Sequence, residues 1–146
     1  MKILIHPFAA HLPSGKPNAK DYPYWEELIT ELKAEGHEII QVGVHGEKQL
    51  TEDFRPNLTQ EQHDELLNEI DLFICVDSWY QHFAHTRGKS GIVLFGVSNP
   101  QIFGWKENIN LYADKKFFRK YQFNVWHDEP LIPESFVKPQ RIMELL

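Results

Sequence analysis

Cysteine, basic residues and long apolar runs are all scarce in this sequence. Cys75 is the one cysteine among 146 residues, which excludes an internal disulfide and any zinc or iron–sulfur site built from several cysteines. A reducing cytoplasm is therefore the expected location. The 15 Lys and Arg against 21 Asp and Glu argue against nucleic acid as a partner, because neutralising phosphates requires a basic surplus. No apolar run approaches the roughly 20 residues that span a bilayer, so we expect no membrane span.

The chain has the length and apolar content of an ordinary globular protein. Its 146 residues, 42% of them hydrophobic, suit a single domain over 1–146 with a substantial core. Residues 122–146 contain three prolines and are expected to form a C-terminal tail that packs on this domain. The first residues lead directly into an apolar strand, so we expect the fold to begin at Met1 without a targeting peptide.

Apolar stretches alternate with helical patterns along the chain. Strands are expected at residues 2–6, 38–42, 70–76, 92–95 and 109–112. Helices are expected at residues 22–35, 59–69, 78–87, 115–121 and 139–146, whereas residues 44–57 read as irregular. Within this pattern, Thr59 and Gln62 fit a capping box at a helix start. The alternation predicts an α/β fold with a single Rossmann-like, doubly wound parallel sheet.

Ligands of such sheets bind beyond the carboxyl ends of the strands, where the strand order reverses. The loops that follow His6, Val42, Val76 and Phe95 are therefore the candidate site. The loop after the first strand, residues 8–21, is unusually long, which favours a functional role.

Residues in the first loop suit a diphosphate. Lys20 could contact it through a flexible ammonium group, or it could be an ordinary solvated lysine. Ser14 and Gly15 could add a hydroxyl and a backbone amide, or could simply form a turn.

The segment after the third predicted strand suits an anion. Asp77 and Ser78 open a helix whose free amides and dipole attract phosphate, although either residue could merely cap that helix. His82 shares a face with Ser78 and could contact phosphate or serve a structural role. His82 and His85 are weakly spaced for a metal, so we expect neither a metal nor a cofactor.

Two further groups of residues leave alternatives open. A base or sugar pocket could be lined by Asn99, Gln101, Phe103 and Trp105, since aromatic rings stack on nucleobases, or these residues could fill core or interface positions. The basic segment 115–121 is expected to be a solvated helix face. The sequence leaves open whether Phe123 and Trp126 in the tail form an oligomer contact.

The order and spacing of these motifs resemble glycosyltransferase family nine, the heptosyltransferase family of lipopolysaccharide assembly. The family signature matches Asp77, Ser78, His82, Ala84, Gly88, Lys89, Leu94, Phe95, Gly96 and Pro100. Upstream, His6-Pro7 with Ala9 resembles the family's first strand-end turn, and residues 20–25 resemble its entry to the first helix. The resemblance extends over residues 1 to about 113.

This resemblance implies the carboxy-terminal, donor-binding half of a two-domain GT-B enzyme. The acceptor-binding half, with its acidic general base, would then come from a separate protein chain or from a homo-oligomer. Trp79 stands where the family has a glycine, and its indole could block the phosphates or stack on a base. The substrate-contacting residues expected on this basis are Ser14, Gly15, Lys20, Asp77, Ser78, Trp79, His82, Gly96 and Asn99.

Two functional hypotheses follow. In the first, the chain binds a nucleotide-diphosphate sugar and transfers the sugar with help from an acceptor-binding partner. In the second, it is a non-catalytic module that binds a nucleotide or a protein partner, because a fold alone does not fix a function. Hydrolysis of a nucleotide sugar by this half alone is a third, weaker option.

Overall fold

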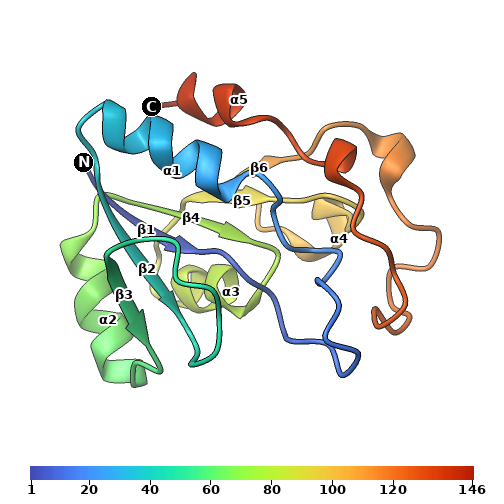
Figure 1. Cartoon of the computed structure of the whole chain (residues 1–146), viewed down its shortest axis with the longest axis horizontal. Coiled ribbons are helices and arrows are strands. Elements are labelled where there is room, and N and C mark those ends of the chain that lie inside the picture. Colours follow the sequence, from blue (N-terminus) through green and yellow to red (C-terminus); the bar gives the residue numbers. More distant parts are fainter.

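The computed structural model describes all residues 1–146 and contains one six-stranded, fully parallel sheet. Its strands are β1 (Lys2–His6), β2 (Glu38–Gly43), β3 (Asp53–Pro56), β4 (Leu72–Val76), β5 (Ile92–Leu94) and β6 (Ile109–Leu111). They lie in the order β3-β2-β1-β4-β5-β6 (Figure 1). The chain moves outward from β1 to one edge and then returns to the other side of β1. The predicted Rossmann-like, doubly wound fold is therefore confirmed, and the strand order reverses between β1 and β4.

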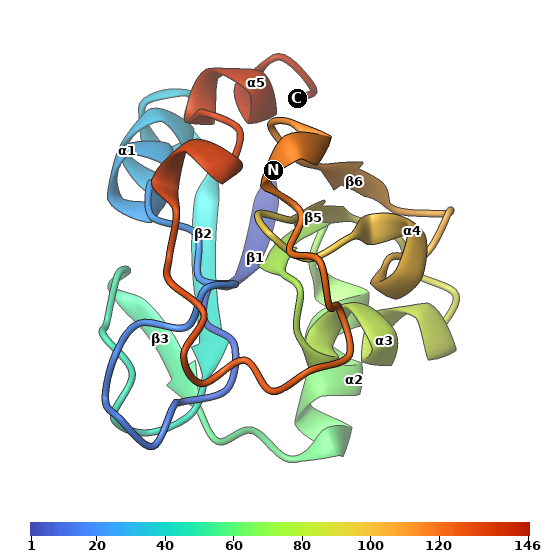
Figure 2. The ribbon, with the colours of Figure 1, turned by 90° about the vertical axis from the view of Figure 1, so that its right-hand side faces the viewer.

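Helices cover both faces of the sheet. They are α1 (Trp25–Ala34), α2 (Gln60–Glu69), α3 (Trp79–Thr86), α4 (Pro100–Phe103) and α5 (Pro139–Met143). Helices α1 and α5 lie on one face, and α2 and α3 lie on the other (Figure 2). Successive residues of a strand point to opposite faces, so Ile3 and Ile5 belong to the core under α1, whereas Leu4 packs with the α2 and α3 side. Burial on both faces explains the continuous apolar runs of the central strands.

The predicted capping box at the start of α2 is present. The Gln62 amide donates to Thr59 Oγ1 at 3.1 Å, and the Thr59 amide donates to Gln62 Oε1 at 2.9 Å. These two bonds satisfy backbone amides that have no partner within the helix.

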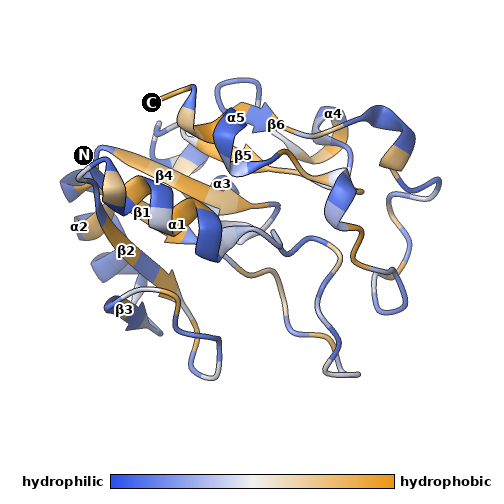
Figure 3. Ribbon diagram, turned by 45° about the horizontal axis from the view of Figure 1, so that its top comes forward, coloured by the Kyte–Doolittle hydropathy of each residue, from blue (hydrophilic) through white to orange (hydrophobic).

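Two predictions of local structure were wrong. Strand β3 lies within residues 44–57, which we expected to be irregular. Its four residues are half-buried at the sheet edge (Figure 3), and Phe54 is the one strongly apolar side chain among them, so no apolar run marks the strand. Only Lys115–Phe117 of the predicted helix 115–121 is helical, as a short 3-10 turn. The chain becomes extended at Phe118, and the Arg119 amide then donates to the Val97 carbonyl at 3.0 Å.

The carboxy-terminal residues contribute to the core. Phe136 and Ile142 are buried in the cluster beneath α1, and Tyr22 Oη donates to the Val137 carbonyl at 2.9 Å. A second 3-10 turn, Pro133–Ser135, precedes this segment. None of the helices combines the length and the apolar character needed to cross a membrane.

Candidate functional site

A cleft of about 930 Å³ lies beyond the carboxyl ends of the central strands. Figure 2 looks toward these ends and shows the loop after β1 and the carboxy-terminal segment in front of them. The cleft is lined by the loop after β1, the loop after β2, the start of α3, Phe103 of α4 and residues 125–127. It therefore occupies the point of strand-order reversal at which ligands of this fold bind.

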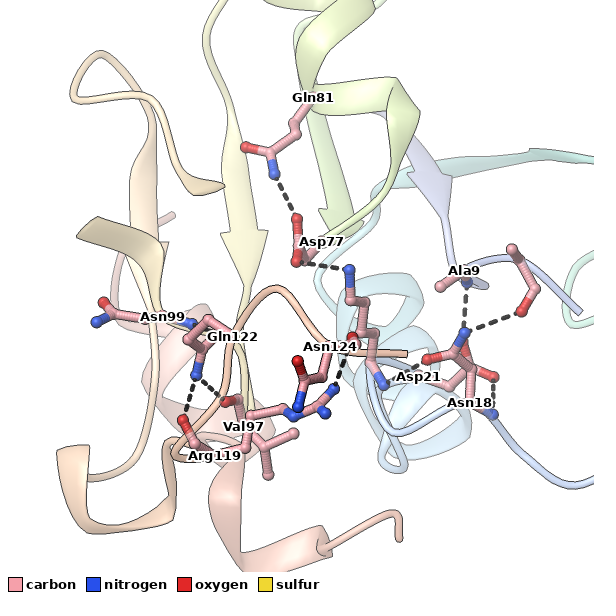
Figure 4. A network of polar contacts seen from close by, with 12 residues as sticks. Ala9, Asn18, Asp21, Asp77, Gln81, Val97, Asn99, Arg119, Gln122 and Asn124 are labelled. Carbon is pink, nitrogen blue, oxygen red and sulfur yellow. Dashed lines mark hydrogen bonds and ion pairs between the residues drawn. The ribbon is translucent and has the colours of Figure 1, made fainter. Parts of the chain in front are cut away.

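Lys20 is the cation of this cleft. Its ammonium nitrogen lies 3.1 Å from Asp77 Oδ2, and the carboxylate of Asp77 is 5% exposed. Asp77 Oδ1 accepts a second bond, from Gln81 Nε2, at 2.9 Å (Figure 4). The ammonium also lies 4.7 Å from the Trp126 ring centroid and 5.5 Å from that of Phe103. Apolar walls and one buried carboxylate thus fix the position of this charge.

The backbone before Lys20 is held by a compact network. Asp21 accepts bonds from the amides of Ala9 and Asn18, at 2.8 and 3.3 Å (Figure 4). The Asn18 side chain donates to the Ala10 carbonyl and accepts from the Lys20 amide, at 2.9 and 3.0 Å. Burial raises the pKa of Asp21 to about 6, although the two amides act in the opposite direction. The long loop is therefore a fixed platform for Lys20.

The amino terminus of α3 has no side-chain cap. Ser78 occupies the cap position, but its hydroxyl is hydrogen-bonded to His6 Nδ1, at 3.0 Å. Burial lowers the pKa of His6 to about 4, so its imidazole, which stacks on Tyr80, is neutral at pH 7. The first amides of this eight-residue helix are left without a cap beside the cleft, where they can bind an anion.

Trp79 lies on the rim of the cleft with 49% of its surface exposed. Its indole packs edge-to-face against His63 and Phe83, with centroids 5.2 and 5.4 Å apart. It also lines a neighbouring hollow of about 520 Å³ between α2 and α3. The Trp79 side chain, which stands where the resemblance predicts a glycine, is thus anchored on the α2 and α3 side of the site.

His82 lines the cleft one turn into α3. Its Nδ1 accepts a hydrogen bond from the indole N–H of Trp105, at 2.9 Å. Lys20, Asp77, Ser78, Trp79 and His82 are therefore brought together in one cleft, as the motif spacing suggested.

The other four predicted residues are outside the cleft lining. Ser14 and Gly15 form an exposed turn, and Gly15 has φ of +74°. Asn99 caps α4 by accepting from the Gln101 amide at 2.9 Å. At Gly96, an added Cβ would lie 2.6 Å from Ser135 Oγ, so its lack of a side chain makes room for the carboxy-terminal segment. Their predicted contacts with a ligand stay predictions.

Glu47 is a cleft residue that no sequence motif predicts. Its side chain is 5% exposed, its Oε2 has no hydrogen-bond partner, and its Oε1 lies 3.8 Å from His11 Nε2. Desolvation by burial raises its pKa. A Cβ at Gly43 would collide with this carboxylate, so the glycine that ends β2 makes space for it. Its place after the second strand was the available signal, but no motif marks the residue.

The carboxy-terminal segment builds the remaining wall. The Arg119 guanidinium lies 4.1 Å from the Trp126 ring centroid and 3.3 Å from Glu129 Oε2. The Gln122 amide nitrogen donates to the carbonyls of Val97 and Arg119, at 3.0 and 2.8 Å (Figure 4). These contacts hold Trp126 over Lys20, more than 100 positions away in the sequence.

Several solved heptosyltransferases have a similar fold. E. coli heptosyltransferase WaaC with ADP has a TM-score of 0.61 and 20% identity, over 75% of this chain and 37% of its own. E. coli ADP-heptose lps heptosyltransferase II has a TM-score of 0.64 and 18% identity, and the match covers 98% of this chain and 44% of that one. A third structure is the dodecameric iron-containing heptosyltransferase TibC from enterotoxigenic E. coli, in complex with ADP-D-beta-D-heptose. It has a TM-score of 0.63 and 17% identity, and the match covers 94% of this chain and 36% of that one.

The present chain thus spans 36 to 44% of the length of these solved chains. Comparison with curated proteins finds no match. The model of glycosyltransferase family 9 (heptosyltransferase) matches residues 4–119, a range that includes the loop after β1, the α3 amino terminus and the loop of Glu47. On the basis of this match, the chain belongs to glycosyltransferase family 9.

Proposed function

We propose that this protein binds a nucleotide-diphosphate sugar in the cleft and takes part in transfer of the sugar to an acceptor. The observation that carries the proposal is the convergence of the Lys20 ammonium and the uncapped amino terminus of α3 on one cleft. Both are groups that bind phosphate. The ADP and ADP-heptose in the solved relatives support a ligand of this class.

The cleft offers complementary groups for each part of such a ligand. The diphosphate would lie against the first amides of α3, with Lys20 and His82 beside it. Glu47 would accept hydrogen bonds from ribose hydroxyls, the task of an acidic residue after the second strand in related nucleotide-binding folds. The free Oε2 of Glu47 supports this placement, because a buried oxygen without a partner is energetically costly.

In the transfer reaction, an acceptor hydroxyl oxygen attacks the anomeric carbon of the sugar. The bond between that carbon and the β-phosphate oxygen breaks, and the diphosphate leaves with its electron pair. Lys20 and the α3 amides would stabilise the negative charge that develops on the diphosphate. The hydroxyl proton passes to a base, which we assign to the acceptor-binding partner.

The rim of the cleft supports such a partner. Phe123 and Val125 are 81% and 69% exposed, and Val125 and Trp79 both line the cleft. Exposed apolar side chains beside a binding site are characteristic of an interaction surface. We propose that a separate acceptor-binding chain, or a second copy in a homo-oligomer, docks on this exposed apolar rim. The proposal retains the cytoplasmic location expected from the single cysteine.

A non-catalytic nucleotide- or partner-binding module is the second candidate. Trp79 favours it, because a bulky indole replaces a glycine that would allow the backbone to approach phosphate closely. In this case ligand would bind, but no sugar would be transferred or released.

Calorimetric titration with ADP and ADP-heptose tests the proposal. We expect saturable binding and a rise of several degrees in melting temperature at about 100 times the Kd. No binding and no thermal shift with either ligand, or with other nucleoside diphosphates, would refute it. Where ADP-heptose binds, chromatography of the products distinguishes transfer in the presence of the partner, release of free heptose by hydrolysis, and no reaction.

A further inference from the structure

Trp105 connects the loop after α4 to helix α3. Its indole N–H donates to His82 Nδ1 at 2.9 Å, and the two rings are edge-to-face. The His85 ring stacks on the indole with a centroid distance of 3.6 Å and an interplanar angle of 9°. His85 Nδ1 also lies 3.9 Å from Glu107 Oε2, in the same loop as Trp105. The indole is therefore held by its flat face as well as by its N–H group.

This hydrogen bond determines where the neutral His82 ring carries its proton. An indole nitrogen donates and cannot accept, so His82 Nδ1 must provide the lone pair. The proton of the neutral ring is consequently on Nε2. Bonds to one ring nitrogen commonly set the role of the other in this way.

We propose that Trp105 is a positioning residue that fixes the tautomer and orientation of His82, so that Nε2–H donates to an oxygen of the bound diphosphate. This inference rests on the proposed function, because it requires a diphosphate in the cleft. His82 lines that cleft and lies one helical turn after Ser78, on the side of the helix amino terminus.

A fixed ring matters because the two edges of a neutral imidazole have opposite chemistry. An Nε2–H group attracts a phosphate oxygen, whereas an unprotonated Nε2 presents a lone pair that repels it. A ring free to turn or change tautomer would present the donor only part of the time. Trp105 removes these alternatives before the ligand arrives, which lowers the entropic cost of binding.

The pair itself can be observed by NMR in the unliganded protein. We expect a scalar coupling through the hydrogen bond between the Trp105 indole nitrogen and His82 Nδ1, and a proton on His82 Nε2 at pH 8. Absence of the coupling, or a proton on His82 Nδ1, would overturn the assignment. This measurement does not depend on whether any nucleotide binds.

Trp105→Phe isolates the effect on ligand binding. Phenylalanine can still stack on His85 but has no N–H group, and the probe ligand is ADP. We expect Trp105→Phe to weaken ADP binding roughly threefold to tenfold in the otherwise natural protein. In a His82→Ala background, the same change should weaken it by less than about twofold, because residues acting through one contact are not additive.

The double-mutant cycle separates positioning from general destabilisation. An equal loss in both backgrounds, or no loss in the natural background, would overturn the positioning role. If the natural protein shows the NMR coupling but binds no ADP, the proposed function fails and the diphosphate role of Trp105 fails with it, whereas the fixed tautomer stands.

Discussion

Replacing Lys20 by methionine removes the ammonium group and keeps a long apolar side chain beside Phe103 and Trp126. The buried Asp77 carboxylate would then retain Gln81 as a partner but lose the ion pair at 3.1 Å. Breaking a fully buried pair costs about 3–5 kcal/mol, and the 20% exposure of Lys20 lets water replace part of the interaction. We therefore expect the free energy of unfolding to fall by about 2 kcal/mol, which in a chain of this length lowers the melting temperature by about 6 °C.

The same substitution should impair nucleotide binding. One charged contact with a phosphate contributes about 2 kcal/mol, so ADP affinity should fall about 30-fold in calorimetric titrations. Lys16→Met, which removes an exposed lysine from the same loop, is the control and should leave both quantities unchanged. Adding Asp77→Asn to Lys20→Met should restore stability without restoring affinity, because the unpaired charge is removed. Unchanged ADP affinity in Lys20→Met would refute the phosphate role of Lys20.

Three further substitutions test other parts of the site. Glu47→Gln should weaken ADP binding about fivefold, and it should not lower stability, because burial disfavours the carboxylate. The control ligand 2′,3′-dideoxy-ADP lacks the ribose hydroxyls and should bind the natural protein and the variant alike. A fivefold loss for both ligands would contradict the ribose role. His6→Asn should make the free energy of unfolding less sensitive to acid. In the natural protein, His6 has a pKa of about 4 when folded and about 6.5 when unfolded, so the unfolded state takes up a proton first as the pH falls. The free energy of unfolding should therefore decrease by up to about 3 kcal/mol between pH 6.5 and pH 4. Urea melts across this range check it, and parallel curves for both proteins would contradict it. Gly96→Ala should lower the free energy of unfolding by about 1–3 kcal/mol in thermal melts, because the added Cβ would collide with Ser135 and Phe136. An unchanged melting temperature would mean that the carboxy-terminal segment shifts freely.

The fold could be predicted because its signals are local. The central strands are continuous apolar runs such as residues 72–76, and the capping box of Thr59 marks the start of α2. Strand β3 carries no such signal, because an edge strand of four half-buried residues has no clear apolar alternation. The basic segment 115–121 was misleading because the chain becomes extended at Phe118, and the Arg119 amide then donates to the Val97 carbonyl in the loop after β5 instead of continuing a helix.

The candidate site could be predicted only in part. The α3 motif and Lys20 were accessible, because each follows a strand whose carboxyl end had to face the cleft. Trp126 and Glu47 could not be predicted from the sequence, because their positions depend on the folded structure. Trp126 is held in the cleft by Arg119, and Glu47 occupies space that the missing side chain of Gly43 leaves free. The bond from Trp105 to His82 likewise joins a loop residue to helix α3, and no sequence period encodes the approach of these two segments.

A titration of the isotope-labelled protein with ADP, followed by backbone amide NMR, tests whether the cleft binds a nucleotide. We expect saturable chemical-shift changes concentrated at the amides of Lys20, Trp79 and Tyr80, with smaller changes on the far side of the sheet near α5. Absence of shifts at millimolar ADP, or shifts confined to residues outside the cleft, would contradict it.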